Sequence, residues 1–175
     1  MTEAIRREMV ALLPRLRRFA VAICGSREEA DDLVKESCER ALSRLDQFAP
    51  GTRLDSWMFR IIQNAWIDRT RAHARRTTDN DLEALAAVPH DARIPEQTEA
   101  RSALAIVRRE VARLPDEQRI ILSLVVVDGM TYQEAANVLK IPIGTVMSRL
   151  ARARKRLAAM VDAGPGLDQA KGGRL

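Results

Sequence analysis

At 175 residues, the chain is long enough for one domain or two small ones, and its 46% hydrophobic but only 3% aromatic content favours an all-α fold. It contains no run of about 20 apolar residues and no apolar segment near its N-terminus, so we expect neither a membrane-spanning helix nor a signal peptide, and a cytoplasmic location. The formal net charge of +5 suits a polyanionic partner such as nucleic acid.

The first predicted helix covers residues 3–23, because apolar side chains recur there every three or four positions. Pro14 lies inside this pattern and is expected to kink the helix or split off its first turn. Gly25 is expected to end the helix. Ser26 and Glu29 then form a capping-box pattern that opens a second helix, which is predicted to run to about residue 45 with an acidic outer face.

The two cysteines, Cys24 and Cys38, have neither CxxC spacing nor a nearby histidine pair, so we expect no metal site. A buried apolar role in a reducing cytoplasm is favoured, with a redox pair as the alternative. The two histidines, His73 and His90, lie in polar surroundings and show no nucleophile–base or metal-ligand spacing. We therefore predict no cofactor and no enzymatic activity.

A turn-forming loop, DQFAPGT, covers residues 46–52 and is expected to expose the lone Phe48. A third helix is predicted over about 53–75. Of its two tryptophans, Trp57 is expected in the core, whereas Trp66 could be either core or exposed. Aromatic residues interleaved with arginines suit single-stranded nucleic acid, in which bases stack and phosphates are neutralised. The polar and basic positions of this helix are Arg60, Gln63, Asn64, Arg69, Arg71, Arg75 and Arg76.

Residues 77–100 are predicted to form a flexible acidic linker, because they hold six acidic residues, two prolines and a single arginine. Extended at about 3.3 Å per residue, these 24 residues would span up to ~79 Å. Further helices are predicted over about 97–113 and from Pro115 onward, the latter apolar on several sides and therefore buried. The Gly-rich residues 162–175 are predicted to be a disordered tail.

A helix, a turn and a second helix are predicted over residues 131–160. Thr131 and Glu134 form a capping box, and Pro142 interrupts the helical pattern. The second helix has one apolar stripe, formed by Val146, Leu150, Ala153 and Leu157. Its other faces are basic, and no Asp or Glu occurs from 135 to 161. The pattern is typical of a DNA-binding helix-turn-helix, with a helical hairpin carrying a solvated basic face as the alternative.

Three blocks of the sequence resemble extracytoplasmic-function (ECF, group IV) sigma factors, which are promoter-specificity subunits of bacterial RNA polymerase. The blocks are EEADDLVKESCERAL, FAPGTRLDSWMFRIIQNAWIDRTR and LPDEQRIILSLVVVDGMTYQEAANVLKIPIGTVMSRLARARKRL. They follow the order and spacing of the family and cover nearly all of residues 5–160. The chain departs from the family pattern at Lys35, Cys38, Lys140 and Met147, where glutamine, a bulky apolar residue, glycine and a basic residue are common.

The resemblance implies an alternative sigma factor made of two small helical domains joined by the linker. Residues 1–76 would form a region 2-like domain that binds polymerase and recognises and melts the minus-10 element. Residues 101–161 would form a region 4-like helix-turn-helix domain that reads the minus-35 element as duplex. The partners implied are the RNA polymerase core enzyme, promoter DNA and an anti-sigma factor.

The resemblance also implies three sets of site residues. The polymerase-binding face would consist of Asp31, Asp32, Lys35, Glu36 and Glu39. Contacts with minus-10 DNA would come from Phe48, Arg60, Asn64, Arg69, Arg71, Arg75 and Arg76. Of these, Phe48 would lie against a flipped base. Contacts with minus-35 DNA would come from Thr145, Ser148, Arg149, Arg152, Arg154 and Lys155.

Two other functions compete with this one. A stand-alone helix-turn-helix transcription regulator would account for residues 131–160 but would leave the first two blocks unexplained. A sigma-like decoy that titrates an anti-sigma factor would not need its DNA-binding residues, so the retention of Arg149, Arg152 and the basic stretch 69–76 argues against it.

Overall fold

The computed structural model describes residues 2–49, 51–79 and 107–162 of the chain. Within these ranges every regular element is a helix and no strand occurs, which confirms the all-α class. Most of the predicted linker and nearly all of the predicted tail lie outside the described residues. None of the described helices is long and apolar enough to cross a membrane.

Three long helices build the N-terminal unit: α1 (Thr2–Cys24), α2 (Arg27–Leu42) and α3 (Leu54–Asp79). α1 continues through Pro14 as one helix, so Pro14 does not split off a first turn, which was one of the two alternatives expected. An interior proline costs roughly 3 kcal/mol, and the complete burial of Leu16 and Phe19 on the same helix offsets that cost. Gly25, with φ +80°, ends α1 as predicted.

The second helix is shorter and the third is longer than the sequence suggested. The Ser26 side chain accepts a hydrogen bond from the backbone N–H of Glu29 and caps α2, which ends at Leu42, three residues before the expected end. A 3₁₀ turn, η1 (Leu45–Gln47), follows before the loop. α3 begins next to the predicted position and continues four residues past the predicted end.

The C-terminal unit starts with a helical segment at 107–112 and continues through α5 (Asp116–Leu122) and the π-helix η2 (Ser123–Val127). Then come α6 (Tyr132–Leu139) and α7 (Ile143–Asp162), which form the predicted helix-turn-helix. Both halves of the capping box are present at the start of α6: Thr131 accepts from the Glu134 N–H, and the Glu134 carboxylate accepts from the Thr131 N–H.

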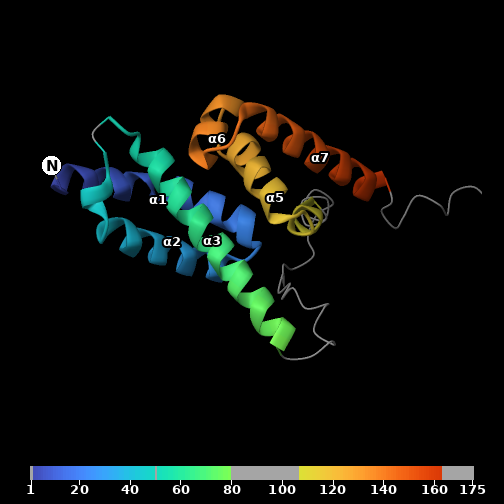
Figure 1. Ribbon diagram of the computed structural model, residues 1–175, viewed down its shortest axis with the longest axis horizontal. Coiled ribbons are helices and arrows are strands. Elements are labelled where there is room, and N and C mark those ends of the chain that lie inside the picture. The colour runs from blue at the N-terminus through green and yellow to red at the C-terminus, as the bar shows by residue number, and fades with distance from the viewer. Residues whose placement is uncertain (1, 50, 80–106, 163–175) are drawn as a thin grey trace, which may run out of the picture.

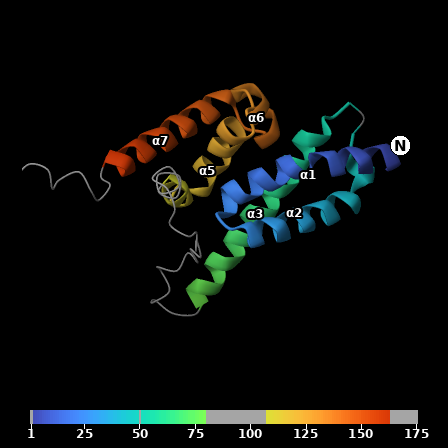
Figure 2. The ribbon, with the colours of Figure 1, turned by 180° about the vertical axis from the view of Figure 1, so that it is seen from behind.

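The two units pack against each other and share one hydrophobic core. α5 and η2 lie against α1, and α6 lies against α3, while α7 runs along the side away from α2 (Figure 1). The view from behind shows the same arrangement (Figure 2). Phe19 of α1 and Phe59 of α3, both buried in that core, meet edge to face with ring centroids 5.1 Å apart.

Charged side chains join the two units at the edge of this core. Arg15 of α1 donates two hydrogen bonds to the carboxylate of Asp128, at 3.1 Å and 2.6 Å, and a third to Asp55 of α3 at 3.2 Å. Arg53 pairs with Asp55 and also with Glu134 of α6, at 3.0 Å. These residues make one connected network from the N-terminal unit to the start of the helix-turn-helix.

Candidate DNA and polymerase interface

Three fully buried side chains fix how α7 is oriented. Val146, Leu150 and Ala153 are at most 1% exposed and pack toward α5 and α6. Leu157, the fourth member of the predicted stripe, is half-buried. Because an α-helix turns about 100° per residue, this stripe directs the opposite side of α7 to solvent. The predicted apolar stripe is therefore confirmed.

The residues predicted to bind minus-35 DNA are not equally available on that exposed side. Arg152, Arg154 and Lys155 are exposed and have no ion-pair partner among the residues that the structure describes. The Ser148 hydroxyl is exposed too, but it donates to the Thr145 carbonyl oxygen at 3.1 Å. Among the described residues, Arg152 is thus an unpaired arginine on the solvent side of the third turn of α7.

Arg149 differs from Arg152 because its guanidinium group pairs with the carboxylate of Glu117, at 2.9 Å, and its side chain is 27% exposed. Glu117 lies on α5, outside the helix-turn-helix, so spacing within α7 could not reveal the pair. The Glu117 side chain is itself 65% exposed, and such a surface ion pair contributes only about 0–1 kcal/mol. Arg149 can therefore exchange its carboxylate partner for DNA at low cost.

The predicted polymerase-binding face of α2 contains both free and paired side chains. Asp32, Lys35 and Glu39 are exposed, and Asp31 pairs with Arg17 of α1 at 2.8 Å. Glu36 is half-buried between two arginines.

Glu36 accepts hydrogen bonds from Arg69 of α3 at 3.0 and 2.5 Å and forms an ion pair with Arg40. Glu36 and Arg69, predicted for two different partners, thus contact each other and join α2 to α3.

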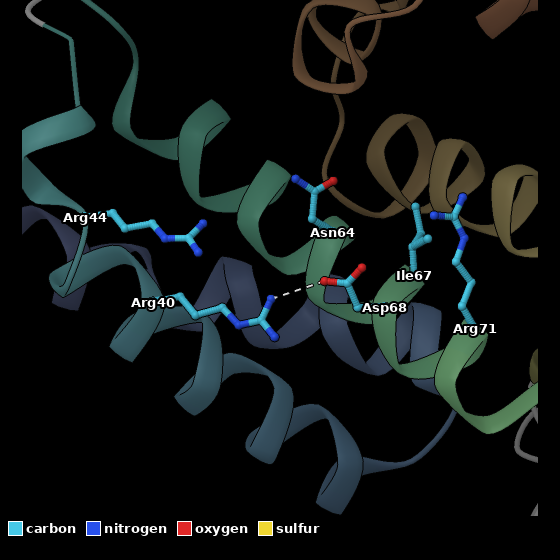
Figure 3. A pocket seen from close by; sticks show the side chains of 6 residues that line it. All are labelled: Arg40, Arg44, Asn64, Ile67, Asp68 and Arg71. Carbon is cyan, nitrogen blue, oxygen red and sulfur yellow. Dashed lines mark hydrogen bonds and ion pairs between the residues drawn. The ribbon is translucent and has the colours of Figure 1, made fainter. Parts of the chain in front are cut away.

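The predicted minus-10 residues partly gather around a shallow hollow of about 380 Å³ between the end of α2 and the middle of α3 (Figure 3). Its lining residues are Arg40, Arg44, Asn64, Ile67, Asp68 and Arg71. Asn64 and Arg71 belong to the predicted set, whereas Arg40 and Arg44 were missed. Arg40 lies in the last turn of α2 and Arg44 lies just beyond its end, but only the packing of α2 on α3 shows that both lie near Asn64.

The other arginines of the predicted minus-10 set lie elsewhere on α3. Arg60 is half-buried, and burial lowers the pKa of its guanidinium group. Arg75 is exposed near the end of α3. The side chain of Arg76 lies outside the described residues.

Phe48 is less exposed than a loop position suggests. Its ring is half-buried and packs on Trp57, with centroids 5.2 Å apart and planes tilted by 51°. Trp57 itself packs against the core from a half-buried position. Any contact between Phe48 and a DNA base must therefore either use the open side of its ring or replace the Trp57 contact.

Trp66 lies at the contact between the two units. Its indole Nε1–H donates to Asp116 of α5 at 3.3 Å, and the guanidinium carbon of Arg119 lies 5.5 Å from its ring centroid. The sequence left open whether Trp66 lies in the core or in solvent. The structure places it, half-buried, at the contact between α3 and α5. Packing between units, which sequence periodicity does not report, determines it.

The cysteines are free thiols in half-buried positions. Burial raises the pKa of Cys24 to about 12, and it also raises the pKa of Cys38. Both groups therefore stay protonated at neutral pH, which makes them poor nucleophiles. Among the described residues, no group of three or more His, Cys, Asp or Glu side chains is arranged to hold a metal ion.

Residues 9–76 match the family model "Sigma-70 region 2", and residues 104–157 match "Sigma-70, region 4". The N-terminal unit and the helix-turn-helix unit are thus the two conserved regions of sigma factors of the sigma-70 class. Comparison with individual proteins of similar sequence identifies the group of sigma factors within this class. The sequence is 35% identical over 164 residues to the ECF RNA polymerase sigma factor EcfG of Rhodopseudomonas palustris, an alignment that covers 92% of this chain and 87% of the relative. The chain belongs to the ECF RNA polymerase sigma factors.

Two solved structures have the same fold. The sigma factor RpoE of Bartonella quintana, in complex with the anti-sigma factor NepR, aligns with a TM-score of 0.72 and 28% identity over 91% of this chain and 98% of that chain. CnrH, in complex with the cytosolic domain of CnrY, aligns with a TM-score of 0.67 and 26% identity over 93% and 90%. The resemblance of the three sequence blocks to ECF sigma factors is confirmed.

Proposed function

We propose that this sigma factor binds core RNA polymerase through the exposed acidic residues of α2, opens the minus-10 element with its N-terminal unit, and reads the minus-35 element with α7. The observation that carries the proposal is the orientation of α7. Its buried stripe leaves Arg152, Arg154 and Lys155 directed to solvent on a helix with no acidic residue before position 162. Such a helix matches the phosphate-lined major groove in shape and charge.

Polymerase binding is assigned to α2 on electrostatic grounds. Asp32 and Glu39 are exposed on the same helix, and no arginine or lysine is paired with either among the described residues. Unpaired surface carboxylates attract a basic partner and speed encounter more than they increase affinity. Because Glu36 already holds Arg40 and Arg69, we assign it a structural role in positioning α2 in addition to any contact with polymerase.

Minus-10 binding is assigned to the hollow between α2 and α3. Arg44 and Arg71 supply positive charge at its rim, and the Asn64 amide can both donate to and accept from a base edge. Arg40 is less available, because it pairs with Asp68 at 3.5 Å and with Glu36. Flipping a base out of the duplex costs a few kcal/mol, and contacts in such a hollow would offset part of that cost.

An anti-sigma factor is the third proposed partner. RpoE of Bartonella quintana and CnrH, both similar to this chain over most of its length, are held by NepR and by the cytosolic domain of CnrY in their structures. We infer that this chain is likewise regulated by a protein that masks its polymerase or DNA contacts. A stand-alone regulator or a decoy would not require all three partners.

The proposal is tested by run-off transcription from a promoter library randomised over both elements. Transcripts should form only when core polymerase and this protein are both present, because the chain supplies promoter recognition and the polymerase supplies catalysis. The Asp32→Ala/Glu39→Ala variant should need more core enzyme for half-maximal transcription. Tight sequence-specific promoter binding by the isolated chain at physiological salt would contradict the sigma role and favour a stand-alone regulator.

The same library separates base contacts from phosphate contacts on α7. Arg152→Ala should lose selectivity at one or two minus-35 base pairs, since a bidentate arginine–guanine contact is worth about 1–3 kcal/mol of discrimination. Lys155→Ala, the matched control, should weaken all promoters alike and flatten the salt dependence. An Arg152→Ala preference profile identical to wild type at every base pair would assign that arginine to the phosphates instead.

A further inference from the structure

An exposed apolar strip lies on α7 beside its basic side chains. The strip consists of Ile143, Met147 and Ala151, which are spaced four residues apart and therefore lie along one line of the helix. Ile143 is 42% exposed and Met147 is 52% exposed. The buried stripe of α7 contains none of the three.

The positive charge near the strip indicates which kind of partner binds it. Arg152, Arg154 and Lys155 follow it on the same helix, and no acidic residue lies between positions 135 and 161. An apolar protein partner would gain little from a surface followed by exposed cations on the same helix, whereas DNA offers phosphates at both edges of a groove whose floor carries base edges. The start of α7 is also open, since a Cβ atom built at Gly144 would meet nothing within 4 Å.

Polar groups near the strip are already engaged within the protein. The Ser148 hydroxyl donates to the Thr145 carbonyl oxygen at 3.1 Å, and the Arg149 guanidinium group is held by Glu117 at 2.9 Å. Met147 has no hydrogen to donate, and its thioether is a weak acceptor. Arg149 can leave Glu117 for DNA, but Ile143 and Met147 are exposed side chains in the first two turns of α7 that offer a base an apolar contact and no hydrogen bond.

Only one base carries an apolar group in the major groove, namely thymine with its C5 methyl. We propose that Met147, assisted by Ile143, reads the C5-methyl group of a thymine in the minus-35 element. This inference rests on the proposed reading of that element by α7 and names the chemistry of one position in it. Met147 would thus set base preference without a hydrogen bond.

The experiment uses transcription by core polymerase with the full-length protein. The preferred minus-35 sequence is first taken from the randomised library, and each thymine in it, on either strand, is then replaced by deoxyuracil, which lacks only the methyl group. Removing one buried methyl from a contact worth ~0.8 kcal/mol should lower transcription about fourfold at one or two positions. Promoters with uracil elsewhere in the element should behave as the thymine promoter does.

The variant Met147→Ala assigns the effect to the side chain. It should lose about the same fourfold on the thymine promoter and should no longer distinguish thymine from uracil at the sensitive position. Because Met147 is exposed, the thermal unfolding of the variant should match wild type, which excludes misfolding as the cause. Lys155→Ala, by contrast, should keep the full uracil penalty while transcribing less from every promoter.

The possible outcomes distinguish a failure of the Met147 proposal from a failure of the proposed reading of the minus-35 element by α7. Wild-type transcription that is indifferent to uracil at every position would overturn the inference and leave minus-35 reading intact. A uracil penalty that persists in Met147→Ala would assign the methyl contact to another residue. Transcription that depends on core enzyme and this protein but shows no base preference in the minus-35 element would contradict the proposed role of α7 itself.

Discussion

At the scale of single residues, the turn between α6 and α7 contains one unusual backbone conformation. Lys140 has φ 51° and ψ 47°, which makes it the only non-glycine residue with positive φ among the described ranges. The left-handed region costs a residue with a Cβ roughly 1–2 kcal/mol. Glycine, which has no Cβ atom, would avoid this cost at position 140.

Lys140→Gly should therefore stabilise the protein by about 0.5–1 kcal/mol, the strain relieved less the entropy that glycine loses on folding. Urea unfolding measures the change. Lys140→Ala is the control, because it removes the charge and keeps the Cβ atom, and it should not stabilise. Equal stabilisation by both substitutions would show that the lysine charge, not the backbone, is unfavourable.

At the scale of elements, the loop between α2 and α3 is held down by the packing of Phe48 on Trp57. Phe48→Ala should destabilise the protein by about 1 kcal/mol, the range of an aromatic pair. It should also reduce open complexes on duplex promoters, if the open side of the ring supports the flipped base as proposed. A promoter with a pre-melted minus-10 bubble should restore part of the transcription.

Asn64→Ala is the companion variant for this prediction. Asn64 is exposed in the hollow, so its loss should leave the unfolding free energy near wild type while open complexes decrease. Stability is followed by thermal unfolding and open complexes by permanganate reactivity of unpaired thymines. A Phe48→Ala defect that is unchanged on the pre-melted promoter would exclude a role in melting.

The elements themselves were largely predictable, whereas their contacts were not. The capping box at Thr131, the glycine stop at Gly25 and the buried stripe of α7 depend on residues within one turn or one helix, which a sequence displays directly. The pairs Arg149–Glu117 and Arg69–Glu36 join residues about 30 positions apart on different helices. Periodicity gives the face of a helix but not the neighbour opposite that face.

At the scale of the whole molecule, the Asp55 carboxylate belongs to the charged network between the two units, and its protonation makes the stability of the protein depend on pH in acid. Burial alone would raise the pKa of Asp55, but hydrogen bonds from Arg53, the Ser56 N–H and Arg15 more than offset burial and lower the pKa to about 2. A carboxyl group whose pKa falls on folding stabilises the protein above its unfolded pKa of about 4. That contribution is lost as the pH falls from about 4 to about 2.

Asp55→Asn should accordingly be less stable than wild type by roughly 2 kcal/mol at pH 7, because it removes the charged centre of the network. The difference between the two proteins should shrink as the pH is lowered from 4 toward 2, where Asp55 becomes protonated. Urea midpoints measured from pH 7 to pH 2.5 give this difference directly. A gap that stays constant over the whole range would mean that Asp55 does not titrate with the predicted low pKa.

The shared core of the two units has a consequence for how this sigma factor can be divided. Ile120, Ile121 and Leu124 are at most 2% exposed, in a cluster that also contains Phe19 and Phe59 of the N-terminal unit. A fragment cut between the two family regions would turn these buried surfaces into exposed apolar patches, which promote association of polypeptides with one another. Region 2 and region 4 match two separate family models. In this chain, however, each region is expected to self-associate as an isolated fragment and to stay monomeric only when both are present.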